Sequence, residues 1–99
     1  MVIISFARYP LESAPEVGKR LKELPPLPPY MTLKGPYLNS EVGKGVNAIN
    51  LFEFEKTKAG DAVEYVAARM AKYMGVPKFT YSVKMWFEAQ EALKMIGLA

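Results

Sequence analysis

Apolar and polar residues follow one another along this chain in two kinds of pattern, one typical of strands and one typical of helices. Runs rich in β-branched and aromatic residues, such as Val2-Ile3-Ile4 and the alternating stretch from Phe79 to Phe87, predict four strands. Apolar residues at helical spacing predict two longer helices and a short one near the C-terminus. Gly43-Lys44-Gly45, between the second and third strands, predicts a hairpin turn. We expect the strands over residues 2–9, 30–40, 46–55 and 78–87, and the helices over residues 13–24, 60–74 and 90–96.

The resulting order, β-α-β-β-α-β, predicts an α+β fold of the ferredoxin-like type, a split βαββαβ sandwich, in a single domain over residues 1–99. This fold has one antiparallel sheet in the strand order 4-1-3-2, with the helices on one face, and here a short C-terminal helix follows. Pro36 supports the order, because proline cannot donate a hydrogen bond to a neighbouring strand and therefore favours an edge position for residues 30–40. The third strand contains no proline and is expected at the centre.

Both longer helices carry signals for their ends and for the face that they bury. Ser13-Ala14-Pro15-Glu16 fits a capping box at the start of the first helix, and Pro25 is expected to end it. Gly75 followed by Pro77 predicts the end of the second helix. The proline-rich residues 25–29 are interpreted as a stiff connector, with a docking motif for proline-binding modules as the alternative. The expected apolar stripes are Val17, Leu21 and Leu24 in the first helix, and Val63, Val66, Ala67, Met70 and Met74 in the second.

The composition removes several kinds of chemistry. The chain has no cysteine and no histidine, which excludes disulfides, thiol nucleophiles, imidazole-based triads and the usual ligands of zinc, copper and haem. We therefore expect no metal and no cofactor, and the balance is against an enzyme although the question stays open. The net charge of +3 is spread over interspersed Lys and Glu residues, which does not favour nucleic-acid binding. No leader and no membrane-spanning run is recognised, and we expect a soluble cytoplasmic protein.

The face of the sheet opposite the helices must meet either water or a partner. Along the third strand, Asn50 and Phe52 lie on one side and Ile49 and Leu51 on the other, so neither side is cleanly polar. Exposure of so much apolar surface would favour aggregation, and we therefore expect a homodimer that closes sheet to sheet. In the order and length of its elements, the chain resembles the dimeric α+β-barrel superfamily.

This resemblance implies two ferredoxin-like subunits that form one barrel, with a small molecule bound between the two sheets. The superfamily includes cofactor-free monooxygenases, lactone isomerases, haem-degrading enzymes and many small families without an assigned function. Most of its enzymes use a histidine or another positioned acid–base group, and this chain has no histidine. The chain is most similar to the members without an assigned function.

The candidate ligand-binding residues combine an amide, aromatic rings and a cation. If they point into one lumen, such groups can orient a small aromatic or acidic ligand, and Arg8 near a strand end can pair with a carboxylate. The alternative is that Tyr81 belongs to the core and Trp86 seals the dimer. Strand alternation places Tyr81 and Lys84 on opposite faces, so both cannot line one cavity. The candidates are Arg8, Asn50, Phe52, Tyr81 and Trp86.

Three other kinds of site are less favoured. Glu53 and Glu55 share one strand face but lie near lysines at a strand end, where solvated carboxylates are expected. Gly43-Lys44-Gly45 lacks the Ser or Thr that a phosphate-binding loop needs after its lysine. The third strand also lacks the alternating aromatic residues on which an RNA-recognition sheet stacks bases. Three hypotheses remain: a small-molecule-binding barrel, a non-catalytic interaction or assembly protein, and an RNA-binding domain.

Overall fold

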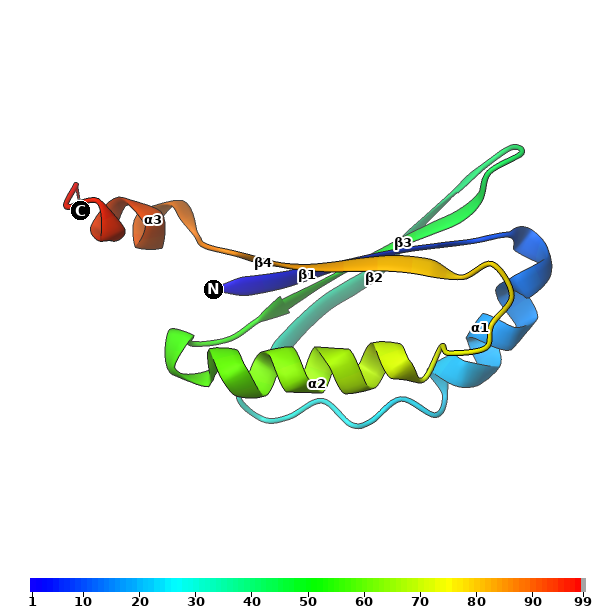
Figure 1. Cartoon of the computed structure of the whole chain (residues 1–99), viewed down its shortest axis with the longest axis horizontal. Helices are drawn as coiled ribbons and strands as arrows, with labels where there is room; N and C mark the ends of the chain where they lie inside the picture. Colours follow the sequence, from blue (N-terminus) through cyan, green and yellow to red (C-terminus); the bar gives the residue numbers. More distant parts are fainter. Residues whose placement is uncertain (99) are drawn as a thin grey trace.

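The four strands form one antiparallel sheet in the order β2-β3-β1-β4, which is the predicted order read from the other edge. The computed structural model describes residues 1–98 and confirms the α+β fold and the order β-α-β-β-α-β (Figure 1). Short 3-10 turns at Leu11–Ser13 and Lys56–Lys58 lead into the two longer helices. The elements are β1 (Val2–Tyr9), α1 (Ala14–Leu21), β2 (Thr32–Glu41), β3 (Gly45–Glu53), α2 (Ala59–Ala71), β4 (Thr80–Trp86) and α3 (Ala89–Met95).

The position of each strand follows from its sequence. Strand β1 lies between β3 and β4, so that Ile3 is opposite both Phe52 and Met85. Strand β2 is an edge strand, as Pro36 predicts, and its register with β3 shifts between Lys34 and Tyr37. The central position of β3 is likewise confirmed.

The two longer helices lie on the same face of the sheet, and α3 projects beyond the end of β4 (Figure 1). Within β1 the alternate residues Ile3, Ser5, Ala7 and Tyr9 are buried on the helix-facing side. The N-terminal ammonium, 2.9 Å from the carboxylate of Glu91, ties α3 to the start of the chain. None of the helices within residues 1–98 is long and apolar enough to cross a bilayer.

The hydrophobic core gathers at one end of the helix–sheet interface. Phe52, Ala62 and Val66 are fully inaccessible to solvent, and Ile3 is almost so. Full burial of a large apolar side chain stabilises the fold by about 1.5–3 kcal/mol relative to its exposure. The remaining buried members of this cluster are Met31, Phe54 and Met70.

The buried face of α2 is rotated relative to the predicted stripe. Val63 and Met74 are 47% and 78% exposed, and Ala67 is exposed as well, so their prediction as core residues is wrong. The helix instead buries Ala62, Val66, Arg69 and Met70. The stripe was misplaced because a buried arginine looks polar in the sequence, so the apolar residues on the neighbouring face appeared to continue the pattern.

Helix α1 also departs from its prediction. The side chain of Ser13 does not cap it; the Ser13 hydroxyl donates instead to the Pro77 carbonyl, 2.7 Å away, so the predicted capping box is wrong. The helix ends at Leu21, and no residue in it is fully buried. The proline-rich connector that follows is held against α2, because the Tyr65 hydroxyl donates to the Pro25 carbonyl at 2.9 Å.

Candidate ligand cavity between the helices and the sheet

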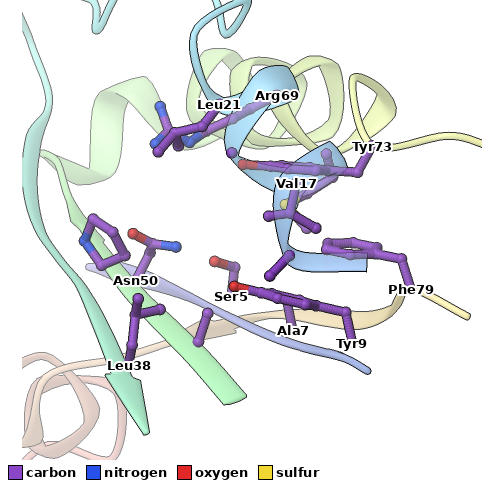
Figure 2. Close-up of a pocket in the computed structure, with 15 residues that line it drawn as sticks. Ser5, Ala7, Tyr9, Val17, Leu21, Leu38, Asn50, Arg69, Tyr73 and Phe79 are labelled. Carbon is purple, nitrogen blue, oxygen red and sulfur yellow. The ribbon is translucent and has the colours of Figure 1, made fainter. Parts of the chain in front are cut away.

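A cavity of about 200 Å³ lies between α1, the C-terminal half of α2 and the helix-facing side of the sheet (Figure 2). Small side chains on the two central strands make its floor. Ala7 of β1 is opposite Ala48 of β3, which is in turn opposite Leu38 of β2. Above this floor α1 supplies Ala14, Val17, Gly18 and Leu21, two of which are small, so the space beneath the helix is not filled.

Three stacked aromatic rings close one end of the cavity. The ring of Phe79 lies 4.7 Å from that of Tyr73 and 6.0 Å from that of Tyr9, and both pairs are nearly parallel. Figure 2 shows the phenol oxygens of Tyr9 and Tyr73 directed toward the same interior as the Ser5 hydroxyl.

The two phenols are protonated at neutral pH, and burial strengthens this preference. Burial raises the pKa of Tyr9. It also raises the pKa of Tyr73, and this effect is larger than the lowering of that pKa by the nearby Arg69 cation; Tyr9 raises it further. Both groups are therefore neutral hydrogen-bond donors at neutral pH.

Asn50 extends from the middle of β3 into the helix–sheet interface and lines the cavity (Figure 2). Its Oδ1 atom is buried and has no hydrogen-bond partner. An unsatisfied buried acceptor costs about 1–3 kcal/mol of folding free energy. Gly35 on the neighbouring strand leaves room for it, since a Cβ there would lie 3.4 Å from Oδ1 and only 2.8 Å from the Ile49 carbonyl oxygen. Figure 2 shows the amide nitrogen on the side of Ser5 and the oxygen turned away from it, so a rotation of the amide by half a turn brings the oxygen to a donor in the cavity.

Arg69 of α2 brings a cation to the same cavity. Only 9% of the residue is exposed, although its guanidinium forms no ion pair with any carboxylate of residues 1–98. Its contacts are a hydrogen bond to the Tyr65 hydroxyl at 3.3 Å and a position over the Phe52 ring at 5.5 Å. Buried charges in proteins are normally paired, so this cation lacks its usual partner.

The structure divides the five sequence-predicted site residues between the two faces of the sheet. Asn50 lines the cavity, Phe52 lies beside it in the core with no exposed surface, and Tyr81 is on the same side but 54% exposed. Arg8 and Trp86 belong to the opposite face. There the Nε of Arg8 donates to the Asn47 Oδ1 at 2.8 Å, and Trp86 is 49% exposed.

Sequence reasoning missed Arg69, Tyr73 and Tyr9. Ala62, Val66 and Arg69 of α2, with Tyr73 in the turn that follows it, are spaced as on one helix face, which is a signal that a search restricted to apolar residues passes over. No cluster of three or more potential metal-ligating side chains occurs within the part of the chain that the structure describes.

The second face of the sheet, here called the open face, carries exposed aromatic residues. Phe6, Trp86 and Tyr37 are 40%, 49% and 56% exposed. Between them, Ile49 and Leu51 of β3 are only partly buried. Strand β3 contributes no aromatic residue to this face, but β1 contributes Phe6 to it.

Comparisons of the chain with protein-family models, with curated proteins and with solved structures give no match. The fold and the cavity therefore carry the functional argument.

Proposed function

We propose that the protein binds a small organic molecule in the cavity between its helices and its sheet. The observation that carries this proposal is the buried Oδ1 of Asn50, an acceptor without a partner on the wall of a cavity of about 200 Å³. Ligand sites in proteins combine mostly apolar walls with a few polar groups that fix orientation, and this cavity has that character.

The volume limits the ligand to a small molecule. An apolar cavity of about 150 Å³ accepts a benzene ring, so a space slightly larger than that accepts one ring with a small substituent. The proposal is for binding and orientation. The neutral phenols of Tyr9 and Tyr73 supply donors, and no reaction is assigned to them.

The test uses benzamide as a neutral single-ring probe, with binding followed by ligand-observed NMR. Ala48→Leu adds bulk to the cavity floor and is expected to abolish binding. Ala67→Leu makes the same change at an exposed position of α2 and is expected to leave binding unchanged. Failure of the unmodified protein to bind both this probe and its carboxylate analogue benzoate, or equal binding by the Ala48→Leu variant, would refute the proposal.

A separate observation supports a second proposal, that two copies associate through the open face. Phe6, Trp86 and Tyr37 leave an exposed aromatic surface there, and Ile49 and Leu51 connect it across the centre of the sheet. A second copy of the chain offers the same surface, as in the dimeric α+β barrels that the chain resembles. The helix–sheet cavity is on the other side of the sheet, so a ligand there would be separate from the dimer interface.

Sedimentation velocity at micromolar concentration tests this association. The unmodified chain is expected to sediment as a dimer and Phe6→Glu as a monomer, because a carboxylate cannot be buried unpaired at the interface. Val42→Glu at the fully exposed hairpin tip is the control and should remain dimeric. A monomeric unmodified chain would contradict the proposal. Salt-dependent RNA binding that is lost with Phe6→Glu would assign the open face to nucleic acid instead.

A further inference from the structure

We infer that the ligand of the helix–sheet cavity is a small hydroxycarboxylate, about the size of one substituted ring, whose carboxylate pairs with Arg69. This inference rests on the proposed function and names the chemical class of its ligand.

The cavity carries a positive charge. Of the described residues that line it, Arg69 alone is charged, and its guanidinium lacks a carboxylate partner within residues 1–98. A buried cation without an anion is unfavourable, and a ligand carboxylate would supply the missing charge. The planar guanidinium presents parallel N–H donors, which match the two oxygens of a carboxylate.

The polar groups of the cavity are mainly hydrogen-bond donors. Besides Arg69, the hydroxyls of Tyr9, Tyr73 and Ser5 are directed into the interior, as Figure 2 shows. Burial favours the protonated forms of both phenols, so they donate rather than repel an anion. A site rich in donors is complementary to a ligand rich in acceptor oxygens.

The number of cations selects a carboxylate over a phosphate. A phosphate monoester carries a charge of about −1.5 to −2 at neutral pH, which a single buried arginine would leave partly uncompensated. A carboxylate carries one charge, which Arg69 balances. The apolar side chains of Val17, Leu38 and Met70 on the remaining wall suit a hydrocarbon body rather than further charge.

The amide oxygen of Asn50, which has no hydrogen-bond partner, indicates which substituent the ligand carries. Asn50 Oδ1 is buried without a partner, and a carboxylate has no proton to offer it. A hydroxyl on the ligand body supplies that donor once the Asn50 amide turns its oxygen toward the cavity. A molecule with a carboxylate at one end and a hydroxyl at another position therefore satisfies both unpartnered groups of the cavity.

The test compares benzoate with its neutral isostere benzamide by calorimetric titration. The unmodified protein is expected to bind benzoate about ten- to a hundredfold more tightly than benzamide, the range expected of a hydrogen bond to a charged group. In Arg69→Gln the two probes should bind equally. Arg69→Lys keeps the positive charge but lacks the parallel N–H donors of the guanidinium, and it should keep part of the preference for benzoate over benzamide. Lys72→Gln removes an exposed charge just beyond the same helix and should change nothing. Thermal unfolding of each variant establishes that it is folded.

The hydroxyl is tested with the three monohydroxybenzoates. At least one is expected to bind more tightly than benzoate, and Asn50→Leu should remove that gain. Equal binding of benzoate and benzamide, a preference that survives in Arg69→Gln, or a hydroxyl gain that survives in Asn50→Leu would overturn the inference while leaving the proposed function intact. Displacement of benzoate by equimolar inorganic phosphate would also overturn it. Absence of binding by both benzoate and benzamide would instead refute the proposed function.

Discussion

The two ends of the helix–sheet interface share the same strands and the same helix, but they are built in opposite ways. At the packed end, Phe52 and Ile3 meet Val66 with almost no exposed surface. At the hollow end, four residues away on each of these two strands, Ala7 and Ala48 lie beneath α1, and about 200 Å³ of space remains. The strand geometry is continuous between them. The difference is therefore one of side-chain size and polarity.

The two ends of the interface therefore have different roles. The packed end buries apolar surface and carries stability. The hollow end holds an unpartnered amide oxygen on Asn50 and a cation on Arg69, both of which cost stability unless something binds them. Because these groups lie beside a cavity, the hollow end has the character of a binding site rather than of an incompletely packed core.

The largest expected effect is at the packed end. Phe52→Ala should lower the free energy of unfolding by about 3–5 kcal/mol, because it removes a fully buried ring and leaves a void. Leu38→Ala, at a position that lines the hollow end and is 61% exposed, should change it by less than about 1 kcal/mol. Urea denaturation measures both. Equal losses in the two variants would erase the distinction between the ends.

A smaller effect of opposite sign is expected at the hollow end. Asn50→Leu replaces an unsatisfied amide by an apolar side chain of similar size and should raise the free energy of unfolding by about 1–3 kcal/mol. Urea denaturation in the absence of ligand gives the sign. Destabilisation by this substitution would show that the amide is satisfied in solution and that the hollow end is an ordinary core.

The smallest expected effect is a dependence of stability on alkaline pH. The pKa values of Tyr9 and Tyr73 are raised by burial above the ordinary value of 10.0, so the unfolded chain loses these protons at a lower pH than the folded chain. Their contribution is complete below pH 10.0 and is lost as the pH rises through the folded-state pKa. Replacement of both residues by Phe should flatten the fall in stability above this pH, as measured by urea midpoints. An unchanged slope would mean that the phenols face solvent.

The sequence was sufficient for most of the fold, because the relevant signals are local. Pro36 identified the edge strand, the hairpin glycines located the turn, and the apolar β1 indicated a central strand. The helix details were less predictable. Ser13 bonds to Pro77, which is distant in sequence, and no local pattern predicts that partner.

The candidate site was predictable only in part. Asn50 was identified as a polar residue in an apolar strand, but the side of the sheet that it faces depends on where the helices pack. Arg69 reads as a solvated charge until the rotation of α2 is known. The cavity itself is a sum of small side chains on different strands, such as Ala7 and Ala48, and becomes visible only when they lie side by side.

The most direct measurement of the central claim is an intermolecular NOE experiment between benzoate and the protein labelled at its methyl groups. Binding at the hollow end predicts cross-peaks from the ring protons of benzoate to the methyl groups of Ala7, Ala48 and Leu38, which line the cavity. Cross-peaks to Ile49 and Leu51 would place the ligand on the open face of the sheet instead. That result, or no cross-peak at saturating benzoate, would contradict the assignment of the cavity as the ligand site.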